Sequence, residues 1–164
     1  MTQKSLTAVY LRRGKEESLE RCHPWIFSGA IERITEGLKP LSEGDIVDVY
    51  TKQGNFIARG HYQIGSIAVR VLSFEEESID QAWWNRRIAA AKALRESLGM
   101  VDNAQTSCYR LIHGEGDLLP GWVVDIYERT AVVQCHSVGM YHSRSHIADA
   151  IREAYGDSIE AIYD

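Results

Sequence analysis

The segment that most constrains the fold is residues 43–62, which read EGDIVDVYTKQGNFIARGHY. Gly54 and Asn55 separate two short runs rich in apolar residues, a pattern typical of a β-hairpin. β-branched and aromatic runs at 6–11 and 67–72 predict further strands on either side of it. Several short strands with only one short helix among them predict a small β-barrel, an architecture that removes exposed strand edges.

The stretch Arg12–Gly29 reads RRGKEESLERCHPWIFSG and combines cations with a flat aromatic ring. Gly14 suits a helix N-cap, carboxylates follow in the first turn and Arg21 falls in the last turn, so we expect a short helix. Pro24 ends that helix, and a strand is expected at Trp25–Phe27. The stretch is open to two interpretations: a capped surface helix leading into a core strand, or a nucleic-acid contact.

The second part of the chain follows the acidic run Glu75–Glu77. Ser78 is the expected N-cap of a long helix over 79–98, which ends before Gly99. The helix is expected to turn one face inward, carrying Ile79, Trp83, Arg87, Ala91, Leu94 and Leu98. Beyond it we expect strands at 108–113, 121–127 and 130–136, a helix at 140–155 and a strand at 159–163.

These elements predict an α+β chain in three parts. The first, 1–74, is the β-barrel; the second, 75–100, is a linker helix; and the third, 101–164, is a small strand-strand-strand-helix-strand domain. The chain ends on Asp164 directly after the last expected strand, which we interpret as a cut at a domain boundary.

Charge is distributed unevenly along the chain. The net charge is −5, but residues 1–74 carry 10 Lys and Arg against 8 Asp and Glu, whereas residues 75–164 carry 8 against 15. If RNA binds, it is therefore expected at the first part. The sequence has neither a signal-like apolar segment nor a run long enough to span a membrane, so no membrane partner and a cytoplasmic location are expected. Three cysteines without a CxxC spacing favour reduced thiols.

Two passages carry a resemblance to a known family. RRGKEESLERCHPWIFSGAI, with EGDIVDVY and GNFIARGHY, resembles the PUA module of bacterial 23S rRNA cytosine-5 methyltransferases, and YRLIHGEGDLLPGWVVDIY resembles the start of their central domain. The resemblance implies that residues 1–74 are a PUA-like barrel that binds structured RNA, with no DNA expected, and that 101–164 are the central domain.

The same resemblance implies a third, C-terminal Rossmann-like domain that binds S-adenosylmethionine and performs catalysis. This chain has no glycine-rich strand-to-helix loop and no Pro-Cys motif, so that domain is expected to be absent and no cofactor is expected to bind here. We expect the full-length protein to be an enzyme and this chain alone to be inactive, with no catalytic residue; whether it forms a homodimer stays open.

An RNA-binding surface needs cations for phosphates and flat rings for unpaired bases. The residues of this chain that fit those needs are Arg12, Arg13, Lys15, Arg21, His23, Trp25, Arg59, His61 and Tyr62. The last three are expected to continue the surface if their strand closes beside the helix. The structural alternative places Trp25 in the core and leaves the cations as ordinary surface residues.

The Gly114–Gly121 passage yields weaker candidates. Its carboxylates are expected to shape a turn, with Asp117 bonding backbone amides, because a strand and not a helix follows. The second-rank site residues are Tyr109, Arg110, Glu115 and Asp117. A zinc site from Cys135, His136, His142 and His146 lacks a recognised spacing, so no metal is expected.

Two other functions compete with RNA binding by a methyltransferase fragment. One is a free-standing barrel for protein interaction in ribosome assembly, whose binding would depend on apolar surface and hardly on salt. The other is a small hydrolase built on His113, Glu115 and Asp117, which rests on adjacency alone.

Overall fold

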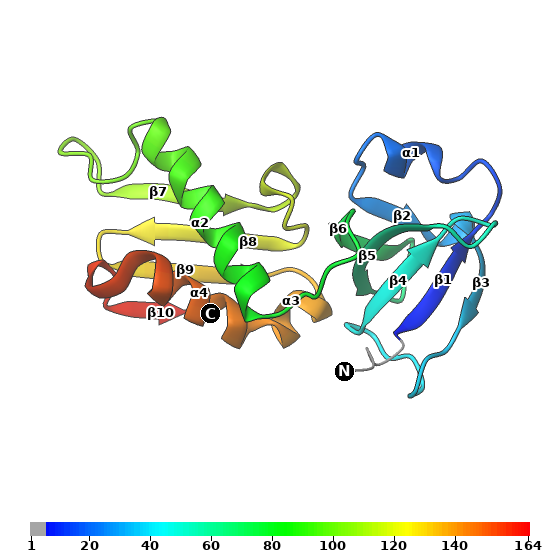
Figure 1. Ribbon diagram of the computed structural model, residues 1–164. Helices are drawn as coiled ribbons and strands as arrows, with labels where there is room; N and C mark the ends of the chain where they lie inside the picture. The colour runs from blue at the N-terminus through cyan, green and yellow to red at the C-terminus, as the bar shows by residue number, and fades with distance from the viewer. Residues whose placement is uncertain (1–5) are drawn as a thin grey trace. The chain divides into compact units, whose positions relative to one another are not determined.

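The computed structural model describes residues 6–164. The chain divides into two units: residues up to Glu77 together with Ser137–Gly139, and Ser78–His136 together with Met140–Asp164 (Figure 1). The long helix expected as a linker over 75–100 lies within the second unit.

The first unit is a curled six-stranded sheet in the order β2-β6-β5-β4-β1-β3. The two edge strands, β2 and β3, are joined by a single 3-10 turn, Ser28–Ala30, so the sheet curls round to bring its ends near each other. All pairs are antiparallel except β1 with β4. The elements are β1 (Thr7–Leu11), α1 (Glu17–Glu20), β2 (Trp25–Phe27), β3 (Ile31–Thr35), β4 (Ile46–Tyr50), β5 (Phe56–Tyr62) and β6 (Ile67–Ser73).

Apolar side chains at alternate positions of these strands fill the interior of the first unit. Val9, Val47, Val49 and Val71 point inward and are at most 2% exposed, whereas Ala8 and Tyr10, on either side of Val9, are only partly buried. Gly60 permits a close crossing of β5 and β6, because a Cβ there would lie 2.1 Å from the carbonyl oxygen of Arg70. The small β-barrel expected from the sequence is confirmed, with β3 as a strand that the sequence did not predict.

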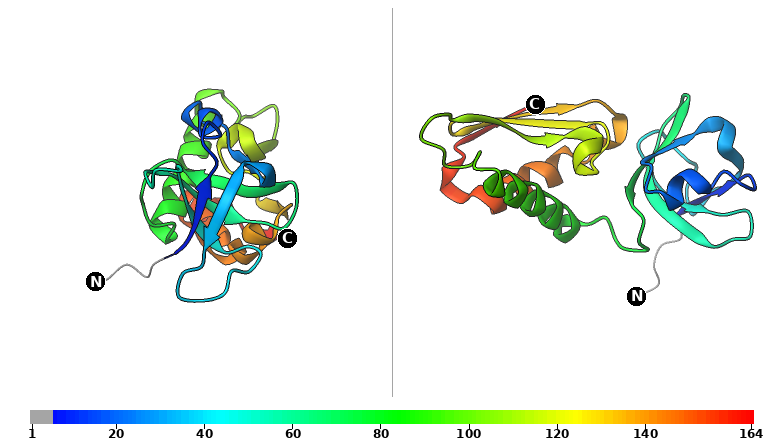
Figure 2. Two further views of the ribbon diagram at one scale, coloured as in Figure 1. Left: turned by 90° about the vertical axis from the view of Figure 1, so that its right-hand side faces the viewer. Right: turned by 90° about the horizontal axis from the view of Figure 1, so that it is seen from above.

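The second unit has a four-stranded sheet in the order β10-β9-β8-β7. Helices α2 and α4 lie on the same side of it (Figure 2). The chain order strand, strand, strand, helix, strand agrees with the prediction. The elements are α2 (Gln81–Ser97), β7 (Cys108–His113), β8 (Trp122–Tyr127), β9 (Thr130–Cys135), α3 (Val138–His142), α4 (Arg144–Tyr155) and β10 (Ala161–Tyr163).

Three details of the second unit differ from the prediction. The N-cap of α2 is Asp80 and not Ser78, because the Asp80 carboxylate accepts the Trp83 N–H at 3.0 Å. The helix expected over 140–155 is two helices that meet at Ser143. The buried face of α2 is also different: its buried residues are Trp83, Trp84, Ile88, Ala91 and Arg95, while Leu94 and Leu98 are 48% and 64% exposed.

Tryptophan rings fill the centre of the second unit. Trp84 packs edge-on against Trp83 and Trp122, with ring centroids 4.8 and 6.1 Å apart, and all three side chains are at most 2% exposed.

No helix within residues 6–164 combines the length and the apolar character that a membrane span requires.

Candidate nucleic-acid interface

The candidate interface is built on the segment that links β1 to β2. Gly14 has a φ of +79° and occupies a turn in which the Lys15 N–H donates to the Arg12 carbonyl at 3.1 Å. The N-cap position of α1 is Glu16, whose side chain makes no capping hydrogen bond, and not Gly14 as predicted, since Gly14 forms the turn before the helix. The expected strand at Trp25–Phe27 is confirmed as β2.

Three aromatic rings cluster at the start of β2. The Trp25 ring centroid lies 5.8 Å from that of His23 and 6.4 Å from that of Phe27, and His23 and Phe27 are 6.5 Å apart. Because His23 is exposed, Phe27 is 50% exposed and Trp25 is only partly buried, the rings present π surface to solvent. Trp25 is thus not the core residue of the structural interpretation. Such rings are what unpaired bases stack on.

A hollow of about 330 Å³ lies beside these rings. Lys15 from the start of the helical segment and Phe27 from β2 lie at its wall, together with Ser18, Leu19, Trp25, Ile26, Gly29 and Ala30. The Lys15 cation and the aromatic rings of Trp25 and Phe27 thus line the same surface depression. Phe27 was not among the residues expected from the sequence, although it lies two residues after Trp25 in a three-residue strand, which puts both side chains on one face.

The four cations of this segment, Arg12, Arg13, Lys15 and Arg21, are all exposed. Among residues 6–164, none of the four forms an ion pair with a carboxylate. Other cations of the chain are neutralised: Lys39 by Asp45, Lys52 by Glu32, Arg110 by Asp125, Arg129 by Glu160 and Arg152 by Asp149. The positive charge of the segment is therefore available to an external anion.

Arg59 and His61 were expected to continue this surface, and the structure instead buries both at 3% exposure. Register explains the burial of Arg59: it lies opposite Asp48 across β4 and β5, and the two side chains form an ion pair at 2.6 Å. Arg59 also donates to the Glu77 carbonyl. A guanidinium desolvated with its own carboxylate is a structural group, and we leave both residues out of the candidate interface.

Tyr62 is also separate from the α1–β2 segment. It is partly buried against the interior of the first unit and lines a different depression, together with Ile34, Leu41 and Ile64. Of the nine residues selected from the sequence, the structure thus gathers six around α1 and β2: Arg12, Arg13, Lys15, Arg21, His23 and Trp25.

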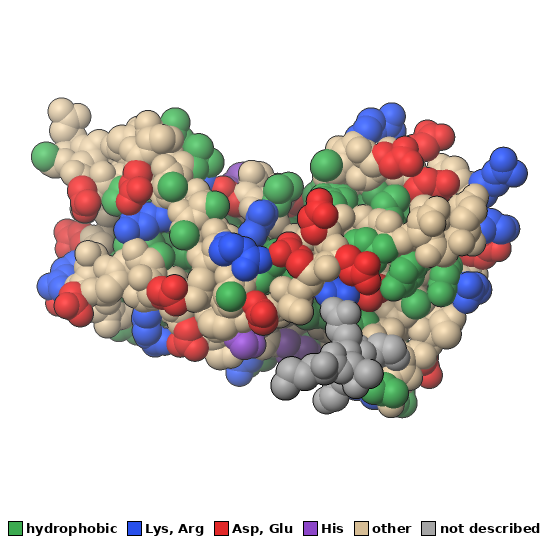
Figure 3. Space-filling view, in the orientation of Figure 1, with side chains coloured by type: hydrophobic (Ala, Val, Ile, Leu, Met, Phe, Trp, Pro, Cys, Tyr) green, Lys and Arg blue, Asp and Glu red, His purple; other side chains and the backbone are tan. Residues whose placement is uncertain are grey.

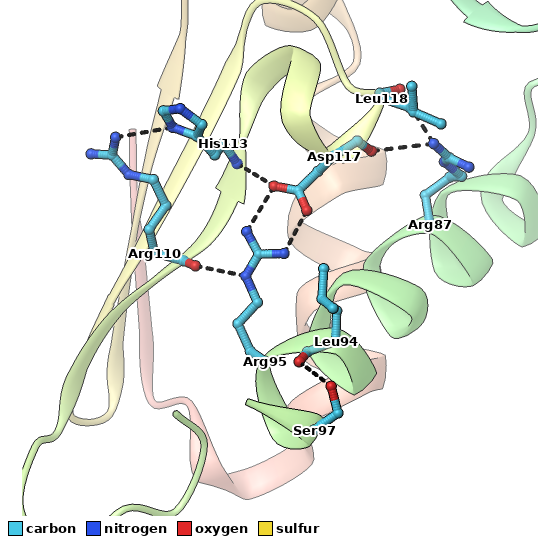
Figure 4. Close-up of polar contacts among 8 residues, drawn as sticks. All are labelled: Arg87, Leu94, Arg95, Ser97, Arg110, His113, Asp117 and Leu118. Atoms are coloured by element: carbon cyan, nitrogen blue, oxygen red, sulfur yellow. Dashed lines mark hydrogen bonds and ion pairs between the residues drawn. The ribbon is translucent and has the colours of Figure 1, made fainter. Parts of the chain in front are cut away.

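The second-rank loop between β7 and β8 is held by two arginines of α2 (Figure 4). Arg95 binds both carboxylate oxygens of Asp117, at 2.5 and 2.8 Å, and its Nε donates to the Arg110 carbonyl at 3.0 Å. Asp117 also accepts the His113 N–H at 2.6 Å, the backbone bond expected from the sequence. Arg87 donates to the carbonyls of Asp117 and Leu118.

This network makes Asp117 structural. The Arg95 and Asp117 side chains are only 10% and 6% exposed, so the pair is desolvated and its function is to fix the loop. Glu115 stays exposed on the same loop. A hydrolase that uses Asp117 as a free carboxylate does not fit this geometry, because Arg95 holds both carboxylate oxygens.

Tyr109 and Arg110 lie on opposite faces of β7. Burial raises the pKa of Tyr109, whose hydroxyl is 2.9 Å from that of Tyr155. Arg110 is exposed and binds Asp125 through two bonds, of 2.9 and 3.0 Å, which raise its pKa. Adjacent residues that face apart cannot contact one ligand together, so these second-rank candidates do not form a common site.

Cysteines and metal ligands do not gather into a site in the described part of the chain. Within residues 6–164, no group of three or more His, Cys, Asp and Glu side chains is arranged to hold a metal ion. Cys22 and Cys108 are exposed free thiols, and burial raises the pKa of Cys135.

Comparison with known proteins identifies relatives of this chain. Residues 9–74 match the model of a family described as a PUA-like domain. The chain is 40% identical over 151 residues to ribosomal RNA large subunit methyltransferase I of Vibrio vulnificus, covering 92% of this chain and 37% of that protein. The protein of the same name from Erwinia tasmaniensis is 40% identical over 158 residues, covering 95% of this chain and 38% of the relative.

Solved structures share the fold at lower sequence identity. A Streptococcus mutans protein described as a SAM-dependent methyltransferase superposes with a TM-score of 0.77 at 19% identity, over 94% of this chain and 40% of that one. A methyltransferase complexed with SAH gives a TM-score of 0.76 at 19% identity, over 98% and 40%. The chain thus spans well under half the length of the relatives that it matches.

Proposed function

We propose that the first unit of this chain binds structured rRNA for a methyltransferase, because the chain belongs to the family of bacterial rRNA large subunit methyltransferases. It spans a little over a third of the length of the relatives that it matches. The finer expectation, 23S rRNA as the RNA, is part of this proposal. The observation that carries it is the group of four exposed cations of the β1–β2 segment, which form no ion pair with a carboxylate among residues 6–164, in the same segment as the rings of His23, Trp25 and Phe27. Cations provide phosphate affinity, and exposed rings provide stacking for unpaired bases.

The described residues do not fit S-adenosylmethionine. The only candidate glycine-rich loop in residues 6–164, Gly114–Gly121, leads into strand β8 and not into a helix, and both carboxylate oxygens of Asp117 are bound to Arg95. In our proposal, methyl transfer from S-adenosylmethionine to a cytosine C5 belongs to a part of the longer protein outside these 164 residues. No catalytic step is assigned to this chain.

The second unit has a supporting role in this proposal. Its cations are engaged in the folded structure: Arg95 holds the β7–β8 loop, Arg110 pairs with Asp125, and Lys92 donates to the Ala154 carbonyl at 2.8 Å. A unit with neutralised cations and an excess of carboxylates is poorly suited to bind phosphates. We therefore assign RNA contact to the first unit.

A salt-dependent binding titration tests the proposal. We expect the chain to bind a structured rRNA hairpin more tightly than a DNA duplex of matched length, with affinity falling at least about tenfold between roughly 50 and 200 mM salt, because each phosphate contact releases counterions. Binding that hardly changes with salt would contradict the proposal and favour the protein-interaction alternative, as would the absence of RNA binding at low salt.

A further inference from the structure

Arg33, on the outer face of β3, is held in a fixed orientation. Its guanidinium carbon lies 3.5 Å from the ring centroid of Tyr10, the residue directly opposite it on β1. Its Nη1 donates to the Thr35 hydroxyl at 2.9 Å. Two contacts from different directions fix the plane of an exposed side chain that would otherwise lose considerable entropy on binding.

The charge of Arg33 is not neutralised. In the part of the chain that the structure describes, no carboxylate forms an ion pair with it, whereas Lys52, also exposed in the first unit, is paired with Glu32 at 2.9 Å. An oriented guanidinium without a carboxylate presents both a flat cationic plane and free donors. Bases stack on arginine planes, and phosphates accept from arginine donors.

The rings beside Arg33 extend this surface in one direction only. Tyr10 stacks on Tyr50 with centroids 5.5 Å apart and planes 25° apart, and Tyr50 meets Phe56 edge-on at 5.9 Å. The charges of Asp48 and Glu76, however, act on Tyr50 and raise its pKa after the larger effect of burial. The Asp48 carboxylate at the Tyr50 end is already paired with Arg59, whereas no carboxylate within residues 6–164 forms an ion pair with Arg33, so an RNA contact is favoured at the Arg33–Tyr10 end.

Arg12 connects Arg33 to the candidate interface. It lies two residues after Tyr10 and directly follows β1, and its N–H donates to the carbonyl of Ala30, the residue before β3, at 2.8 Å. Residues two apart on an extended chain share a face and are roughly 7 Å apart along it. Figure 3 shows Lys and Arg side chains spaced along this rim of the first unit, from above α1 down to β3, with carboxylates between them.

From these observations we propose that a single-stranded segment flanking the bound rRNA helix crosses β1 and stacks an unpaired base on Arg33. Arg12 contacts the phosphate between that base and the part of the RNA held at α1 and β2. This inference rests on the proposed RNA-binding function and adds a second contact, outside the α1–β2 segment, that recognises an unpaired flank.

Three RNAs and three variants test the inference. The chain is titrated with a blunt rRNA hairpin and with the same hairpin carrying a short single-stranded extension, placed on either end in separate experiments. We expect the extension on one end to tighten binding by about fivefold or more, since base stacking contributes strongly to single-strand binding. Arg33→Ala should remove that gain and leave blunt-hairpin affinity nearly unchanged.

Arg33→Lys keeps the charge but loses the planar stacking surface, so it should lose most of the gain as well. Lys52→Ala removes an exposed but ion-paired cation of the same unit and should keep the full gain. Equal affinity of the unchanged chain for blunt and extended hairpins would overturn the inference while leaving the proposed function intact. Equal weakening of both RNAs by Arg33→Ala would also overturn it, whereas no binding of any RNA would contradict the proposed function itself.

Discussion

Replacing Asp117 with alanine is expected to lower the free energy of unfolding of the second unit by about 3–5 kcal/mol. The change leaves the Arg95 guanidinium buried without its carboxylate and removes the acceptor of the His113 N–H. Both losses act on the loop between β7 and β8, so the effect should exceed that of an ordinary surface substitution.

Urea denaturation followed by tryptophan fluorescence measures this effect. Three of the four tryptophans, Trp83, Trp84 and Trp122, are buried in the second unit, so the signal reports mainly on its unfolding. Asp149→Ala is the control, because Asp149 pairs with Arg152 on the surface of α4 with both side chains more than 60% exposed. If Asp117→Ala unfolded at the same urea concentration as the unchanged chain, the structural role given to the Arg95–Asp117 pair would be wrong.

The second large effect concerns RNA. Replacing Arg12, Arg13 and Lys15 together with alanine is expected to weaken rRNA-hairpin binding by roughly ten- to a hundredfold at low salt and to lower the salt slope by about 2–3, one phosphate contact per residue. These side chains are exposed and make no ion pair with a carboxylate in the described residues, so the folded state should be little affected.

A control of equal charge separates specific contacts from net charge. Lys39, Lys52 and Arg152 are exposed but ion-paired, with side-chain exposures of 71%, 52% and 63%. Their triple alanine variant also removes three positive charges and should leave both RNA affinity and salt slope close to those of the unchanged chain. Equal losses in the two triple variants would mean that overall charge, and not the segment before α1, governs binding.

The sequence predicted strands correctly where a turn or proline signal stands next to a run of apolar residues. Pro24 and the apolar residues after it predicted β2 with its observed bounds, and Gly54-Asn55 predicted the β4–β5 hairpin. β3 was missed because Ile31–Thr35, an edge strand with charged residues on its outer face, lacks a continuous apolar alternation. The short helix was predicted, but its cap depends on the φ of Gly14, which the sequence does not reveal.

The sequence did not predict which charged side chains are buried where their partners lie far away in the chain. The apolar residues of α2 predicted an inward face with Leu94 and Leu98, yet the helix turns Arg95 inward to reach Asp117, 22 residues away. Similarly, Arg59 resembles a surface cation until β4 and β5 pair and place it opposite Asp48. Arg33 was not expected from the sequence because its orientation depends on Tyr10, its neighbour on the paired strand β1. Phe27 could have been found, since it lies two residues after Trp25 in the same strand.

The most direct test of RNA contact at α1 and β2 is photo-crosslinking. An rRNA hairpin substituted with 4-thiouridine is irradiated with the chain, and the crosslinked peptides are identified by mass spectrometry. We expect crosslinks within residues 12–33, centred on the exposed rings of His23, Trp25 and Phe27. Crosslinks confined to residues 78–164 would contradict the assignment of RNA binding to the first unit.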